Sequence, residues 1–192
     1  MIVFQHQNPS SQEEVLYYLE FLQKEIYTYF SSIHENEFFS HRNGEWSPAE
    51  TLMHITITTN LMGFTWKIPS FVLNFFYGKA SKRKTFKQWK DSFFKQNGNF
   101  DDEGILSPIP LKNVKKLEKQ KKKILKKFNQ ACINLFHDLE KMDPAKYFQL
   151  KIPFFHEYGP LSIQESLFLH IFHLTHHHNR VKEKYTVILP NE

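Results

Sequence analysis

The sequence predicts an all-α protein, folded as an up-down four-helix bundle with a long insert between the second and third helices. Four long segments carry apolar residues at alternating spacings of three and four, the period of helices that pack along a seam. No alternating apolar and polar pattern of useful length indicates a strand. The chain has 192 residues, of which 41% are hydrophobic and 16% aromatic. It can therefore bury a sizeable core, and we expect a single domain over 1–192.

The first helix is expected to begin near Ser11, which can cap it while Glu14, three residues later, completes a capping box. Its apolar stripe is regular, and neighbouring helices must cover such a stripe. The stripe consists of Val15, Leu19, Leu22, Ile26, Tyr29 and Ile33.

The second helix is expected to begin at Ser47, with Pro48 at its first position and Glu50 completing another capping box. The capping role accounts for Glu50, so we expect no catalytic role for it. The helix is apolar on most sides, which is typical of a central helix. His54 lies two turns inside it, among apolar residues, and a polar ring in such company needs a partner.

Residues 67–113 predict a long connection with one or two short helices, folded over one end of the bundle, because prolines and a glycine punctuate them. An aromatic run within this connection can either line a pocket for an apolar substrate or pack structurally, and we favour packing. The run contains Phe71, Leu73, Phe75, Phe76 and Tyr77.

The third helix is expected over Val114 to Met142. Nine lysines against one acid, Glu118, fall between Lys112 and Lys127. Such a run suits a phosphate or an anionic membrane surface, or it is a solvated helix face. We favour the solvated face, because no arginine and few aromatic residues accompany the lysines. The net charge of +5 does not by itself indicate a nucleic-acid partner.

The last helix is expected to follow a turn at Gly159 and Pro160, with Pro160 or Ser162 at its start. Five of the eleven histidines fall within nine residues of this helix. His173 and His177 are one helical turn apart on one side, with about 6 Å between their β-carbons. Burying two imidazoles without partners costs about 1–3 kcal/mol each. A bound cation would remove that cost, provided that another segment supplies a third ligand.

Three features indicate a soluble cytoplasmic protein. The N-terminus shows no signal-peptide pattern, and the most apolar run, residues 68–77, is too short to span a bilayer. A single cysteine, Cys132, excludes an intrachain disulfide and suits a reducing compartment. We therefore expect neither a membrane nor a nucleic acid as partner.

Two motifs carry a resemblance. The first is Trp46-Ser47-Pro48-Ala49-Glu50-Thr51-Leu52-Met53-His54, and the second joins Pro160-Leu161-Ser162 to His173-x-x-His176-His177. Together they resemble the DinB-like superfamily of four-helix-bundle metalloproteins, in which a Trp-Ser-x-x-Glu box leads to a histidine on the second helix. The fourth helix of that superfamily carries His-x-x-His-His-x-x-Gln. The resemblance covers most of the chain in layout and implies that His54, His173 and His177 are the metal ligands.

The superfamily includes bacillithiol and mycothiol S-transferases and mycothiol-dependent maleylpyruvate isomerase. Three histidine ligands leave a position open, as in catalytic zinc sites, and imidazole also suits nickel, iron and copper. We expect a divalent ion, zinc or nickel first, in an enzyme of thiol S-transferase or hydrolase type that activates a thiol or water. Its substrate would be a small molecule, with low-molecular-weight thiols among the candidates.

Two alternatives stay open. The first is a non-catalytic metal-binding or stress-response protein, with His170 or His176 as a fourth ligand and a homodimer that buries bundle surface. The second and less favoured is nucleic-acid binding through Lys112 to Lys127. Arg180 stands where the superfamily has glutamine, preceded by Asn179. Arg180 either binds an anionic group near the metal or points to solvent, and we favour solvent; the superfamily's substrates do not carry over.

Overall fold

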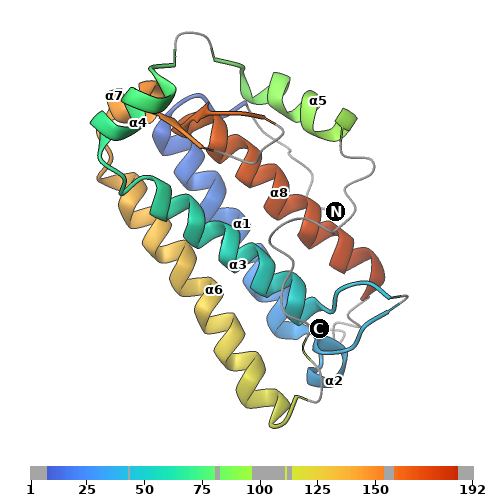
Figure 1. Ribbon diagram of the computed structural model, residues 1–192. Coiled ribbons are helices and arrows are strands. Elements are labelled where there is room, and N and C mark those ends of the chain that lie inside the picture. The colour runs from blue at the N-terminus through green and yellow to red at the C-terminus, as the bar shows by residue number, and fades with distance from the viewer. Residues whose placement is uncertain are drawn as a thin grey trace.

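Four long helices lie side by side in the computed structural model, which describes residues 8–42, 44–80, 83–96, 111, 114–153 and 158–185 (Figure 1). They are α1 (Gln12–Ser32), α3 (Pro48–Thr65), α6 (Leu117–Glu140) and α8 (Ile163–Lys184). α1 and α3 each pack against both α6 and α8. In the described part of the chain the strands are β1 (Lys151–Ile152) and β2 (Leu161–Ser162), an antiparallel pair of two residues each. The prediction of an all-α protein is confirmed.

Three of the four long helices begin with a complete capping box, in which a serine hydroxyl and a glutamate carboxylate accept from each other's backbone N–H groups. The pairs are Ser11 with Glu14, Ser47 with Glu50, and Ser162 with Glu165. The predicted starts of α1 and α3 are therefore confirmed. Of the two candidates for the start of α8, Ser162 is the N-cap.

The predicted stripe of α1 is confirmed with one exception. Tyr29 is only partly buried, and its hydroxyl donates to the backbone carbonyl of Tyr185 beyond the end of α8. Phe30 is fully buried in its place. The exception follows from the 3.6-residue helical period, which drifts away from a 3.5-residue stripe along a long helix.

In its described residues, the connection between α3 and α6 contains two short helices, α4 (Ser70–Tyr77) and α5 (Phe86–Gln96), as predicted. α4 packs against β1, and α5 packs against α8. Within the aromatic run, Leu73 is buried and Tyr77 packs partly on the core, but the three phenylalanines are exposed. The prediction that this run packs structurally is therefore wrong for the phenylalanines, because α4 turns Leu73 and Tyr77 toward the core and these three rings toward solvent. Two further short helices are α2 (Glu35–Phe38) and α7 (Pro144–Gln149).

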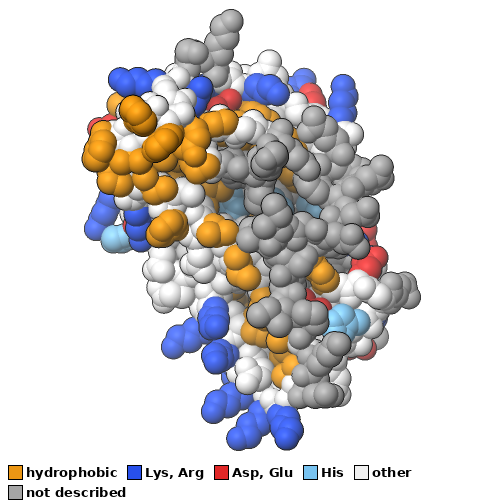
Figure 2. Space-filling model, viewed as in Figure 1, with side chains coloured by type: hydrophobic (Ala, Val, Ile, Leu, Met, Phe, Trp, Pro, Cys, Tyr) orange, Lys and Arg blue, Asp and Glu red, His pale blue; other side chains and the backbone are white. Residues whose placement is uncertain are grey.

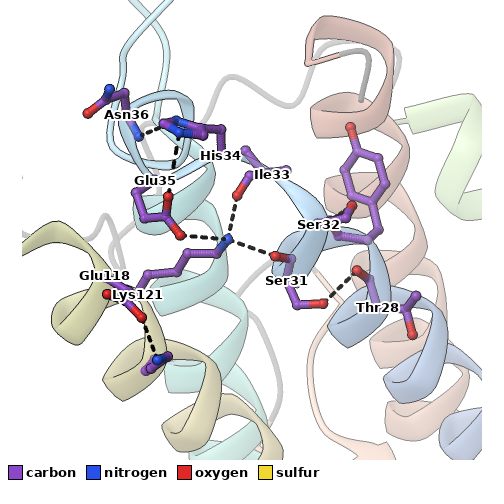
Figure 3. Close-up of polar contacts among 11 residues, drawn as sticks. Thr28, Ser31, Ser32, Ile33, His34, Glu35, Asn36, Glu118 and Lys121 are labelled. Carbon is purple, nitrogen blue, oxygen red and sulfur yellow. Dashed lines mark hydrogen bonds and ion pairs between the residues drawn. The ribbon is translucent and has the colours of Figure 1, made fainter. Parts of the chain in front are cut away.

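α6 begins at Leu117, three residues later than predicted, after Lys116 adopts a left-handed backbone with φ of 57°. Lys121 is buried and bonds to the end of α1, donating to the carbonyls of Ser31 (2.7 Å) and Ile33 (Figure 3). A cation is favourable there because the last carbonyls of a helix lack partners within it. The other described lysines of the run are exposed, as expected for a solvated face, and Lys112 lies outside the described residues. None of the described helices is both long and apolar enough to cross a membrane.

Candidate metal centre

The three predicted ligands converge between α3 and α8. The Nε2 atom of His173 lies 3.0 Å from Nε2 of His54 and 3.0 Å from Nε2 of His177. The ligand atoms of all three side chains lie within 4.8 Å of one another. His54 and His177 are buried, and His173 is half-buried. The structure thus brings together residues that are 119 positions apart in the sequence.

Local structure explains why these rings meet. His173 and His177 are one turn apart on α8, so their side chains lie on the same face. On α3, His54 follows Glu50 of the capping box by one turn, so the box that fixes the start of the helix also fixes the place of the ring. The first turns of α3 thereby set the third ligand against the pair on α8.

Trp46, the residue before the N-cap of α3, covers two of the ligand rings. Its ring lies nearly parallel to that of His177, with centroids 6.1 Å apart, and its centroid is 5.0 Å from that of His54. The sequence motif includes Trp46, but the motif alone assigned it no role. The structure gives it one, because contact with both rings restricts their orientation.

The chemistry of the three nitrogens fits a cation better than hydrogen bonds. A neutral imidazole has one N–H donor and one acceptor nitrogen. Nε2 of His173 has either one proton or one in-plane lone pair, so it cannot form a well-directed bond to both neighbouring Nε2 atoms at 3.0 Å. A metal ion satisfies all three lone pairs at once. Zinc–nitrogen bonds of about 2.0–2.1 Å in a tetrahedron place the nitrogens about 3.3 Å apart, close to both observed distances.

Burial favours the form of the histidines that binds metal. It is the largest cause that lowers the pKa of His173 and of His177 well below the ordinary value, and the neighbouring imidazoles lower both further. Both rings are therefore neutral near pH 7. A neutral ring offers a lone pair to a metal ion, whereas a protonated ring does not.

His170 has a different role from the three converging histidines. Its Nε2 lies 3.2 Å from Oγ1 of Thr59, whose hydroxyl donates to the carbonyl of Ile55 at 2.6 Å. Thr59 therefore accepts from the His170 ring. Burial, assisted by the nearby His54, lowers the pKa of His170 to about 4. His170 is a hydrogen-bonded core residue, so the structure does not favour it as a fourth ligand.

His178 faces away from the ligands and packs on α1. Its ring lies edge-on to Tyr29 at 5.2 Å and 6.4 Å from Phe30. Burial lowers the pKa of His178 to about 4. The ring of His176 lies 5.4 Å from that of His177, beside the converging group.

Charged residues next to His177 pair with each other. Nη2 of Arg180 lies 3.4 Å from Oε2 of Glu45, and the Lys184 ammonium pairs with the same carboxylate. These three residues, with Trp46 and His177, line one small pocket. Arg180 is 28% exposed, so the favoured prediction that it points to solvent is wrong. It links the last turns of α8 to the segment before α3.

Glu50 has the structural role that the sequence predicted. Burial raises the pKa of its carboxyl, but hydrogen bonds from Ser47, Leu111 and His41 outweigh burial, so the net pKa is lowered. Its Oε2 lies 2.7 Å from Nε2 of His41. An ionised carboxylate with this many donors is a poor candidate for proton transfer.

Comparisons with known proteins add no assignment. The chain has no significant match among family models, curated proteins or solved structures. The resemblance to the DinB-like superfamily therefore rests on the two motifs and stays a prediction.

Proposed function

We propose that His54, His173 and His177 bind one divalent metal ion, zinc or nickel. The observation that carries this proposal is the position of His173 Nε2, 3.0 Å from the same atom of both other rings. The resemblance implies an up-down bundle of the DinB-like type. The helix packing supports this type, because α1 and α3 each pack against both remaining long helices. We assign the chain to that type as part of the same proposal.

The proposed activity is that of a metal-dependent enzyme of thiol S-transferase or hydrolase type. Three protein ligands are the number found in catalytic zinc sites, and a metal bound there would lower the pKa of a coordinated water or thiol. The chain's own residues would hold the ion through imidazole nitrogens, and Trp46 restricts two of those rings. The substrate class is a small molecule, with low-molecular-weight thiols as first candidates.

A non-catalytic metal-binding protein is the second candidate, and the carboxylates favour it. Glu50 is held by capping and insert contacts, and Glu45 is paired with two cations. Neither is available as a general base near the ligands. With both carboxylates engaged, we expect an enzyme built on this site to use a metal-bound group or the substrate itself for proton transfer.

Metal content tests the proposed site. Tag-free protein should contain about one zinc or nickel ion per chain, as expected for a three-histidine site. The His54→Ala and His173→Ala variants should lose it while circular dichroism shows unchanged helicity. His137→Ala is the matched control, because His137 lies on α6 with its side chain 60% exposed and should keep the metal. A folded wild type that takes up neither zinc nor nickel on reloading would refute the site.

Cobalt substitution separates the two candidate functions. In an enzyme with an open position, adding a low-molecular-weight thiol to the cobalt protein should produce a thiolate-to-cobalt charge-transfer band. Thiol addition to an electrophile, or hydrolysis of an activated ester, should then require the metal. A cobalt spectrum that no thiol or small anion changes would indicate a closed site and favour the non-catalytic protein.

A further inference from the structure

Three phenylalanines on one short helix are exposed. Phe71, Phe75 and Phe76 on α4 are 76%, 83% and 68% exposed, whereas Leu73 on the same helix is 2% exposed. Figure 2 shows hydrophobic side chains gathered over this corner of the molecule. A contiguous apolar surface of this kind marks an interaction site more often than single exposed side chains do.

The fold does not require the apolar face of α4 that the three exposed phenylalanines form. Leu73 and Tyr77 lie one turn apart and seat α4 on the core. Phe71 and Phe75 are also one turn apart, but on the solvent side, and the ring of Phe76 stands edge-on to that of Phe75 at 5.2 Å. The exposed rings thus gather on the solvent side of α4, where they contribute little to burial in the folded chain.

Two basic residues lie beside α4. Lys79 and Lys146 line the hollow between α4 and α7, and no carboxylate is among the described residues that line it. Lys146 is held in place because its Nζ donates to the carbonyl of Trp66 at 2.8 Å. Of the carboxylates on adjoining elements, Asp138 pairs with Lys67 and the side chain of Asp143 caps α7.

We propose that this α4 surface, formed by Phe71, Phe75, Phe76, Lys79 and Lys146, binds the interface of anionic lipid bilayers. Aromatic rings that enter the headgroup boundary, next to cations that meet anionic lipids, form the usual pattern of a peripheral membrane helix. The helix lies along the membrane and does not cross it. The length of the run 68–77 therefore excluded a membrane span but not this mode of contact.

A second copy of the chain is a poorer occupant of the α4 surface. A two-fold contact through the same rings presents Lys79 and Lys146 of one copy to a partner with the same basic residues. The hollow supplies no carboxylate to pair with them among its described lining. Charge complementarity thus favours an anionic bilayer.

Vesicle flotation of the full chain tests the proposal. The protein should float with phosphatidylcholine vesicles containing about one-third phosphatidylserine, and more weakly with phosphatidylcholine alone or at high salt. Replacing all three phenylalanines by glutamine should lower the partition coefficient by about tenfold or more. Lys79→Gln should lower it to a smaller extent, and only on anionic vesicles.

The matched control replaces Tyr17 and Phe21 on α1, whose side chains are 72% and 44% exposed, by glutamine. It should float like the wild type. The absence of wild-type flotation on anionic vesicles, or equal flotation of the triple variant, would overturn the proposal. A triple variant that only converts a dimer to a monomer in light scattering would assign the surface to a second copy. Metal content should be unchanged in every variant, so failure here is distinguishable from failure of the metal site.

Discussion

Removing the buried capping glutamate of α3 should destabilise the protein far more than removing the exposed one of α1. Glu50 accepts from the backbone N–H of Ser47 (2.8 Å), the Ser47 hydroxyl (2.9 Å) and the backbone N–H of Leu111 (2.9 Å). Its carboxylate is also 2.7 Å from His41. Glu50→Ala leaves these donors without their acceptor at the buried N-terminus of α3.

The expected loss can be worked out from these contacts. Leaving one buried donor unsatisfied costs about 1–3 kcal/mol, and a lost cap costs about 0.5–2 kcal/mol. Some donors will regain water, so we expect Glu50→Ala to lose about 3–5 kcal/mol of unfolding free energy. Urea denaturation followed by circular dichroism measures it, provided that the slope of the transition stays constant.

Glu14→Ala is the matched control because it removes the same motif at an exposed position. Glu14 accepts from the backbone N–H and hydroxyl of Ser10 and from the backbone N–H of Ser11. Water can replace this carboxylate, so the loss should be clearly smaller. Equal losses in the two variants would mean that burial of Glu50 and its bond to Leu111 contribute nothing to stability, which would refute the prediction.

The same contacts predict a pH dependence. The pKa of Glu50 is lowered from 4.5, since hydrogen bonds to the ionised form outweigh the opposing effect of burial. A carboxyl whose folded pKa is lower than its unfolded pKa stabilises the protein above the unfolded value. That contribution is lost as the pH falls through the folded pKa. The stability difference between wild type and Glu50→Ala should therefore shrink below about pH 4.5 and stay constant above about pH 6.

Three further predictions test the core and the proposed metal site. Lys121→Met should lower the unfolding free energy, measured by urea denaturation, by about 2–3 kcal/mol, because it removes a buried charged donor from two carbonyls. Lys122→Met, at an exposed position of α6, should leave the unfolding free energy unchanged. Thr59→Val should cost about 1–3 kcal/mol because it removes the acceptor of the buried His170 N–H; unchanged metal content would confirm that His170 is no ligand, and a lost metal would contradict it. Zinc at about a hundred times its dissociation constant should raise the unfolding free energy of the metal-free wild type by about 2.7 kcal/mol. The same addition should have no effect on His173→Ala, and an equal increase there would place the zinc elsewhere.

The grouping of the three histidines could be predicted because each half of it is encoded locally. The pair on α8 follows from a spacing of four within one helix, and the place of His54 follows from a capping box four residues earlier. What the sequence alone could not provide was the contact between the helices. The resemblance supplied it, and the 3.0 Å distances now support it on independent grounds.

Other features could not be read from the residues because tertiary contacts decide them. Arg180 looked like a surface residue, but the partner that holds it, Glu45, is distant in sequence. Phe71, Phe75 and Phe76 looked like core residues because aromatic side chains are usually buried. Which residues of α4 face the core depends on β1 and the elements around it, and these come from another part of the chain.

The two buried capping glutamates connect the site to the insert, and each does so with its second oxygen. Glu50 caps α3 with Oε2 and accepts from Leu111 with Oε1, while Glu165 caps α8 with Oε2 and accepts from Lys84 and Trp89 with Oε1. A capping box needs only one carboxylate oxygen. The motif therefore predicts the helix start but not the hydrogen bonds that the other oxygen accepts from the insert. The two helices that carry the histidines are thus fixed at their first turns by the same carboxylates that hold the insert. The free-energy loss expected for Glu50→Ala therefore exceeds that of a cap alone, because one substitution releases the start of α3 and the end of the insert together.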